Sequence, residues 1–412
     1  MNTISSGHQN RNTLRYEAKR GAIINVASML FDRNGIKGTM LCTIAKEVGL
    51  NTNSITYYFK KKEDIVFECL MYTIKTFESI AEIAEKEKTS QERVKCFMRE
   101  FFRITTESSL GNHPRIMAFR DAKELDDPYT KIVFDAYIKM FKRVRNLLIE
   151  REITPKNKII SSLRTHFILT QAHWARIWID SYNIDSYDKI MFYIIDIILN
   201  GLSADNYSLE QIKPSNKIME FNAPKSRNQD FLVAAINLIN EFGYGGTSID
   251  RISASLGVTK GSFYHHIPKR EDLFAECIEQ TQFTVREIQK IADEENNNGL
   301  GKLVSISRAL IKLNLSEQHQ LLRISAWGEI LDFTKPHEKI EFLREFSQNL
   351  NDLLATGMMD GSIRPTHQSI AAMMIIGMIN SAISLNKWIP GVENIDIDLL
   401  YVKLIYHGLF NE

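Results

Sequence analysis

The chain has 412 residues, of which 44% are hydrophobic and 25% are charged, a composition typical of a globular protein with a substantial core. Its 51 basic and 50 acidic side chains leave a net charge of +1, which excludes a polycation that binds nucleic acid through its overall charge. The length exceeds that of one ordinary domain and predicts two.

The first residues, MNTISSGHQNRN, are polar and lack the apolar stretch of a signal peptide. No apolar run reaches the roughly 18 residues that a membrane-spanning helix needs. The four cysteines (Cys42, Cys69, Cys96 and Cys277) form no CxxC pair and have no histidine partner at zinc-finger spacing. These features predict a cytoplasmic protein with no membrane contact, no metal and no cofactor.

The second half of the chain repeats the first at an offset of 208 positions. Thr39 falls on Thr247, Gly49 on Gly257, and the helical apolar pattern of residues 23–30 recurs at residues 231–238. Asn200-Gly201-Leu202 closes one half, as His407-Gly408-Leu409 closes the other. Long segments with helical periodicity dominate, and period-2 alternation is scarce, so we expect an all-α fold in two tandem units.

The repeat sets the expected domain boundaries. Residues 1–70 and 226–279 form two equivalent small helical modules, and residues 71–202 and 280–412 form two larger helical domains. Residues 203–225 contain Pro214 and Pro224 with weak periodicity, which indicates a linker.

In each module the first helix is expected to end at a glycine-rich corner, RNGIKGT or EFGYGGT. Thr39 and Thr247 then stand where a hydroxyl can cap a short second helix. A third helix follows, containing NTNSITYYF in one copy and TKGSFYHHI in the other. Two helices joined by a tight glycine turn are typical of the motif that places its second helix in the DNA major groove.

Residues 39–65, TMLCTIAKEVGLNTNSITYYFKKKEDI, and residues 247–273, TSIDRISASLGVTKGSFYHHIPKREDL, resemble the TetR family of bacterial transcription regulators. The resemblance implies a three-helix DNA-binding module, followed by a larger helical domain that binds a small effector and supplies a dimer contact. Copy one departs from the family pattern at Asn53, where glycine is usual, and at Thr56, where tyrosine is usual. Copy two departs at Ile267, where phenylalanine is usual. The implied DNA-binding residues are Thr39, Asn51, Thr52, Asn53, Ser54, Tyr57, Tyr58 and Lys62, with Thr247, Thr259, Lys260, Gly261, Ser262, Tyr264, His265, His266 and Arg270.

The larger domains offer candidate effector ligands. IIGMINSAISLNKWIPG in copy two resembles TetR-type regulators that sense fatty acyl-CoA, and HFILTQAHWARIWIDSY lies on the corresponding helix of copy one. Aromatic rings and a cation beside an apolar helix suit an acyl or flat ligand, although the same aromatics also suit a core or dimer interface. A metal site on the two histidines is disfavoured, because they are seven residues apart and lack an acidic third ligand. The candidates are His166, His173, Trp174, Arg176, Trp178, Trp327, Asn380 and Trp388.

The sequence therefore predicts a ligand-responsive transcription regulator, with repression the expected output and operator DNA and a small effector as partners. One chain acts as a monomeric pseudo-dimer, or two chains form a homodimer, and the unlike segments NTNSIT and TKGSFY predict an asymmetric operator. No GxSxG, P-loop, dinucleotide-binding or HExxH motif is present, which argues against an enzyme, and no catalytic residue is expected. The alternative is a protein-interaction module that retains the fold but has lost DNA binding in one or both copies.

Overall fold

The computed structural model describes residues 5–119, 125–149, 155–205, 207–221, 226, 228–316, 320–323, 336–389 and 395–411. Over these residues it is built from helices, and its one β-bridge joins Ser203 to Ile363. The predicted all-α fold is therefore confirmed. None of the described helices combines the length and the apolar character that crossing a lipid bilayer requires.

The helices of the first half are α1 (Ser5–Gly38), α2 (Leu41–Glu47), α3 (Thr52–Tyr58), α4 (Lys62–Ala84), α5 (Ser90–Ser109), α6 (Tyr129–Asn146), α7 (Pro155–Ile179), η2 (Ile184–Ser186) and α8 (Tyr187–Asn200). The connection contains η3 (Leu209–Gln211) and α9 (Asn216–Met219). The second half contains α10 (Gln229–Gly246), α11 (Ile249–Ser255), α12 (Lys260–His266), α13 (Arg270–Glu295), α14 (Gly299–Leu315), α16 (Pro336–Met359), α17 (Gln368–Ser381), η4 (Ala382–Ser384), α18 (Leu385–Trp388) and α19 (Ile397–Tyr406).

The helix boundaries follow the sequence repeat. Helices α11, α12 and α13 each begin 208 positions after α2, α3 and α4. Cap residues define the next helix in both halves, because the side chain of Thr89 accepts from the backbone N–H of Glu92, and that of Asn298 accepts from Gly301. The second, third and fourth helices of the two halves thus begin at equivalent positions.

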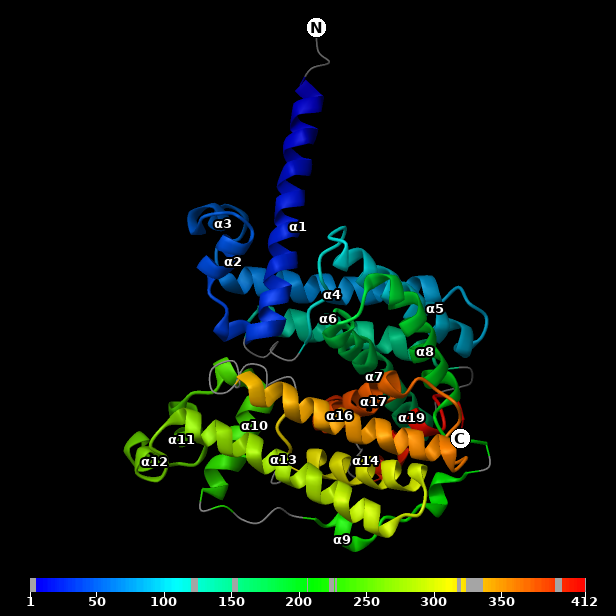
Figure 1. The fold of residues 1–412 in the computed structure, drawn as a ribbon. Helices are drawn as coiled ribbons and strands as arrows, with labels where there is room; N and C mark the ends of the chain where they lie inside the picture. The colour runs from blue at the N-terminus through cyan, green and yellow to red at the C-terminus, as the bar shows by residue number, and fades with distance from the viewer. Residues whose placement is uncertain are drawn as a thin grey trace.

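The two halves pack against each other at two places. Helix α1 contacts α10 between the small modules, and α7 and α8 contact α17 and α19 between the larger domains. In Figure 1, α2–α3 and α11–α12 lie on the left of the molecule, whereas α19 and the C-terminus lie on the right. Both short-helix pairs therefore lie on the same side of the molecule, opposite the packed ends of the two halves.

Specific polar contacts fix the packing of α7 on α17 and α19. The Nε1–H of Trp174 donates to the carbonyl of Met373 over 2.6 Å, and Nδ1 of His166 lies 2.9 Å from the hydroxyl of Tyr401. A Cβ added at Gly377 would lie 2.4 Å from Cδ1 of Trp174, so the indole needs a glycine opposite it. The fit of Trp174 against Gly377 makes the contact between α7 and α17 specific.

The ends of the two halves meet backbone to backbone. Gly201 and Gly408 both have positive φ, 72° and 92°, and Leu202 and Leu409 donate N–H groups across to Tyr406 and Ile198. A Cβ at Gly201 would lie 2.4 Å from the carbonyl oxygen of Tyr406. Only glycine satisfies both the left-handed backbone and the close approach.

The predicted linker is packed along much of its length. Leu209 and Ile218 are buried, and α9 contacts α13 and α14. Lys217 forms an ion pair with Glu294 at 2.9 Å. The connection between the halves therefore forms part of the second half's packed structure.

Candidate nucleic-acid interface and its contacts with the larger domains

A glycine corner closes the first helix of each module, and a threonine fastens it. Gly35 and Gly243 have φ of 71° and 72° inside α1 and α10. The hydroxyl of Thr39 donates to the carbonyl of Gly35 over 2.9 Å, and that of Thr247 donates to Gly243 over 2.8 Å. Both threonines are buried.

The predicted capping role of the two threonines is therefore wrong. Helix α2 begins after Met40, which has no capping side chain, and Ser248 caps α11 by accepting from the N–H of Arg251. Each hydroxyl instead donates to the carbonyl of the glycine at the corner. Thr39 and Thr247 are buried in the module, and their expected DNA contact stays a prediction.

Lys62 and Arg270 begin α4 and α13 and hold the same corner from the other side. Nζ of Lys62 donates to the carbonyls of Ile36 at 2.9 Å and Thr39 at 3.2 Å. Arg270 donates to the carbonyls of Tyr244 at 2.8 Å and Thr247 at 2.6 Å, and its guanidinium lies 4.6 Å from the ring centroid of Tyr244. Backbone carbonyls of their own module thus bind both cations, and their expected phosphate contact stays a prediction.

The outer face of α3 carries the other residues that the sequence indicated in copy one. Asn51, Thr52 and Asn53 are exposed, and the Asn51 side chain caps α3 by accepting from the N–H of Ser54 over 2.7 Å. Tyr57 is 72% exposed, which is unusual for a tyrosine. The start and the outer side of this helix are thus open to a partner.

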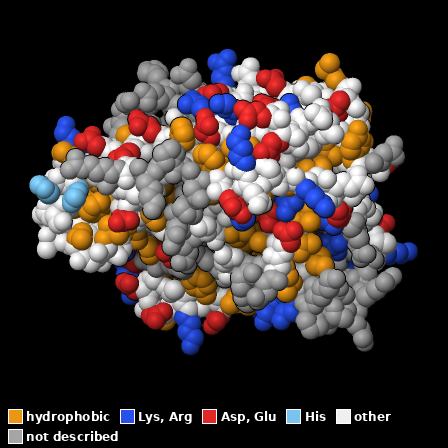
Figure 2. Space-filling model, turned by 90° about the horizontal axis from the view of Figure 1, so that it is seen from below, with side chains coloured by type: hydrophobic (Ala, Val, Ile, Leu, Met, Phe, Trp, Pro, Cys, Tyr) orange, Lys and Arg blue, Asp and Glu red, His pale blue; other side chains and the backbone are white. Residues whose placement is uncertain are grey.

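Helix α12 presents a different set of side chains at equivalent places. Thr259 caps it by accepting from Ser262, and Tyr264 is 46% exposed. Lys260 is exposed and pairs with Asp250 on α11 at 3.1 Å. The other exposed residues of this face are Gly261, His265 and His266. Figure 2 shows histidine side chains at this end of the molecule, with acidic and basic groups interspersed over the rest of the face shown.

An extension of α1 lies beside α3. Helix α1 begins at Ser5, whereas α10 begins at Gln229, the position equivalent to Gly21. Tyr16, on this extension, stacks on Tyr58 at 5.0 Å and meets Tyr57 edge-on at 5.9 Å between ring centroids. Tyr58 is therefore partly covered by Tyr16. The sequence repeat gave no indication of this contact, because α10 begins at the position equivalent to Gly21.

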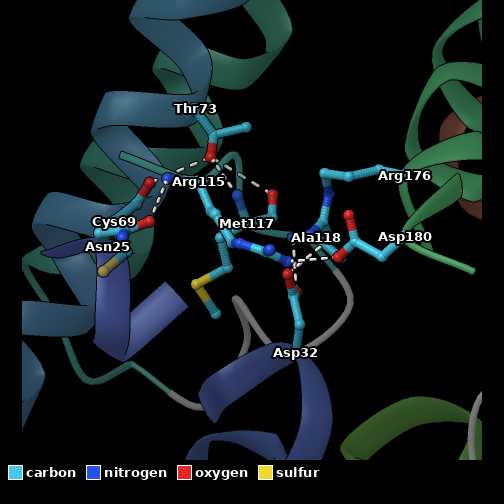
Figure 3. Close-up of polar contacts among 9 residues, drawn as sticks. All are labelled: Asn25, Asp32, Cys69, Thr73, Arg115, Met117, Ala118, Arg176 and Asp180. Carbon is cyan, nitrogen blue, oxygen red and sulfur yellow. Dashed lines mark hydrogen bonds and ion pairs between the residues drawn. The ribbon is translucent and has the colours of Figure 1, made fainter. Parts of the chain in front are cut away.

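Each larger domain contacts its module through an extended segment, which we call the strap. The strap is residues 115–118 in the first half and residues 320–323 in the second. In the first half, the N–H of Met117 donates to the hydroxyl of Thr73 over 2.8 Å, and that of Ala118 donates to Asp32 over 2.9 Å (Figure 3). The second carboxylate oxygen of Asp32 accepts from Arg176 on α7 at 2.5 Å. Helix α1 is thus bound to the strap and to α7.

The second half repeats the strap contacts with a neutral side chain. The N–H of Leu322 donates to Thr281 over 3.1 Å, and that of Arg323 donates to the amide oxygen of Asn240 over 2.8 Å. Asn240 and Thr281 stand 208 positions after Asp32 and Thr73. These residues were not predicted from the sequence, although two polar positions that recur at the repeat offset within apolar helices could have indicated them.

The predicted effector ligands of copy one do not converge on one site. His166 contacts Tyr401 on α19, Trp174 lies in the α7–α17 contact, and Arg176 forms its ion pair with Asp32. His173 lies between Phe77 and Phe119, and burial, with a smaller effect of Arg176, lowers its pKa to about 3. Trp178 is buried beside Tyr182. The alternative interpretation, core and interface, describes these contacts better.

Two further candidates lie in the second half, and a third falls outside the described residues. Trp388 packs on Tyr137 of α6 at 4.4 Å between ring centroids, so it joins the two halves. Asn380 lines a small apolar pocket, with a cavity volume of about 30 Å³ and partly open to solvent, together with Leu310, Phe346 and Ile376. Trp327 belongs to residues 324–335, which are not described. No charged side chain occurs in the described pocket lining.

Each half thus carries a helix-turn-helix module whose third helix is exposed and whose first helix is bound by a larger helical domain. The model of the family described as "Bacterial regulatory proteins, tetR family" matches residues 23–69 and again residues 231–277. The family model therefore matches once in each half, which gives a tandem arrangement of two TetR-like units. The matched ranges correspond at the repeat offset and run from α1 to α4 and from α10 to α13.

Relatives match one unit at a time. The Transposon Tn10 TetC protein of Escherichia coli is 31% identical over 112 residues, which are 26% of this chain and 56% of that protein. The chain thus spans little more than half the length of this relative. The "Fatty acid metabolism regulator protein" of Bacillus subtilis is 24% identical over 186 residues, 43% of this chain and 93% of that protein. The structure of a TetR family regulator, PfmR from Thermus thermophilus, aligns with 18% identity and a TM-score of 0.33, covering 42% of this chain and 95% of that one.

Proposed function

We propose that this chain is a ligand-responsive transcription regulator that reads one operator with both of its modules, as a covalent pseudo-dimer. The observation that carries the proposal is the placement of α3 and α12, both exposed and both on the same side of the chain (Figure 1). Two-fold dimers place two recognition helices in successive major grooves on one side of DNA, about 34–36 Å apart. The contacts of α7 and α8 with α17 and α19, which join the two halves, support this pseudo-dimer.

The two recognition faces differ in chemistry, which supports an asymmetric operator. Helix α3 offers amides and hydroxyls, from Asn53 and Thr52, that suit the N6 and N7 atoms of adenine or a phosphate. Helix α12 offers the ammonium of Lys260, which suits the O6 and N7 acceptors of guanine, beside the ring of Tyr264. Two unlike faces on one rigid chain select two unlike half-sites.

Regulation by an apolar effector is the second part of the proposal. The pocket lined by Leu310, Phe346 and Asn380 adjoins the second strap through Leu322, and the strap binds α10 through Asn240. A ligand that favours one strap position therefore shifts the module by linkage, and couplings of about 1–3 kcal/mol change DNA affinity roughly 5–150-fold. The named role of the Bacillus subtilis relative in fatty acid metabolism supports an acyl or similarly lipophilic effector.

The test is the salt dependence of duplex DNA affinity, measured by fluorescence anisotropy from about 50 to 200 mM salt. A regulator that neutralises phosphates loses affinity steeply over this range, and Lys260→Ala reduces the logarithmic slope by about 1. The matched control is Lys290→Ala, an exposed lysine near the distal end of α13, which leaves the slope unchanged. Absence of salt-dependent binding would overturn the proposal in favour of a protein-interaction module.

A further inference from the structure

The two larger domains differ at the positions that shape the pocket. Phe77 on α4 and Val285 on α13 each stand four residues after the strap-binding threonine. Phe101 on α5 and Leu310 on α14 each stand 12 residues after the cap of their helix. Val285 and Leu310 line the pocket of the second half. The equivalent positions of the first half therefore carry phenylalanine where the second half has valine and leucine.

The phenylalanines of the first half occupy the equivalent space themselves. Phe77 stacks on Phe101 at 5.8 Å and on Phe97 at 6.0 Å between ring centroids. The imidazole of His173 closes this cluster against Phe77 at 5.1 Å. The three phenylalanines are at most 1% exposed. These rings thus pack on one another at the place equivalent to the pocket of the second half.

We propose that the chain binds one apolar effector, in the second half only. The equivalent place in the first half is filled by its own phenylalanines, and the first half responds to the effector through its contacts with the second half. The inference rests on the proposed effector response and adds its location and its stoichiometry. The described lining offers apolar side chains with the amides of Asn314 and Asn380 and no charge, so the ligand portion held there is an uncharged apolar chain or ring.

The signal has a continuous route from that pocket to the first module. Asn314, in the pocket wall, donates to the carbonyl of Ile379 on α17 over 2.8 Å and accepts from the N–H of Leu321 in the strap over 3.1 Å. Helix α17 in turn binds α7 through the side chain of Gln171, which donates to Met374 over 3.0 Å. Arg176, one and a half turns further along α7, carries the contact to α1. A ligand in this pocket is thus connected by these contacts to both modules.

The experiment counts binding sites on the full chain with N-phenyl-1-naphthylamine, an uncharged apolar fluorophore, in the absence of DNA. We expect saturation at one probe per chain, and Val285→Phe weakens binding at least about tenfold, because it places a ring where the first half has one. The double variant Phe77→Val with Phe101→Leu copies the second half into the first, and it is expected to bind two probes.

The second variant keeps the test decisive if Val285→Phe fails to fold. No probe binding to the natural chain, two probes bound to the natural chain, or a single probe bound to the double variant would each overturn the inference. None of these readings depends on DNA, so failure of the DNA titration would overturn the proposed function and leave the site count unaffected.

Discussion

Arg176 and Asp32, 144 positions apart, form an ion pair of 2.5 Å between α7 and α1, with side chains 9% and 16% exposed. It joins the first module directly to the helix that packs on the second half. A pair buried to this degree adds little net stability, because desolvation offsets the attraction, but removal of one partner leaves a buried charge unpaired. The pair is therefore better suited to fixing the position of α1 than to stabilising the fold.

A double-mutant cycle tests the coupling between these two residues. Arg176→Met leaves the carboxylate of Asp32 without its cation and is expected to reduce the free energy of unfolding by about 3–5 kcal/mol. Asp32→Asn keeps an acceptor for the N–H of Ala118, as Asn240 does for Arg323 in the second half. The double variant is therefore expected to recover most of the loss in urea unfolding. Additive effects of the two changes would refute the coupling.

Arg270→Met tests whether this cation is structural. The change removes two charged hydrogen bonds, to Tyr244 and Thr247, each of which stabilises by about 1.5–3 kcal/mol. We expect a less stable second module and weaker DNA binding with an unchanged salt slope, in contrast to Lys260→Ala. Lys62→Met is the matched change in the first module. A salt slope that falls by about 1 would restore the phosphate contact that the sequence indicated.

Gly201→Ala tests the contact between the ends of the two halves. The new Cβ would meet the backbone of Tyr406 at 2.4 Å on a residue with positive φ, so we expect a loss of roughly 2–5 kcal/mol in the free energy of unfolding. Gly111→Ala is the control, because Gly111 also has positive φ but has open space around it. Its expected loss is about 1–2 kcal/mol. Equal shifts in melting temperature would contradict the close approach.

The buried imidazole of His166 predicts a pH dependence of stability. Burial, with a smaller effect of the charge on Arg323, lowers its pKa from 6.5 to about 3. Between these values the unfolded chain binds more protons, so the free energy of unfolding falls as the pH falls below about 6.5. At a pH of about 5 the loss is on the order of 2 kcal/mol.

Urea unfolding at about pH 7 and about pH 5 measures this effect, with His166→Gln as the comparison. The variant lacks the titrating group and is expected to lose less stability over the same interval. Parallel losses in the two proteins would show that His166 is not the group responsible.

The repeat made the fold and the exposed faces of α3 and α12 predictable, because local periodicity and turn residues are written twice. The repeat offset alone does not show which side chain will donate a hydrogen bond to a given backbone carbonyl. Thr39 and Lys62 suit a cap and a phosphate by type, yet both bind the turned carbonyls of a glycine corner.

Contacts between distant segments were beyond the sequence as well. The sequence marked Gly201 and Gly408 as the ends of the halves, but their contact depends on how α8 and α19 cross. The Asp32–Arg176 pair and the ring-filled site around Phe77 likewise depend on helix packing, which periodicity does not encode.

The central claim, that one chain reads one asymmetric operator with both modules, is tested most directly by selection from a random duplex library, followed by sedimentation of the purified complex. The account predicts two unlike half-sites about one helical turn apart, occupied by a single chain. A palindromic site occupied by two chains, with like modules on like half-sites, would contradict it.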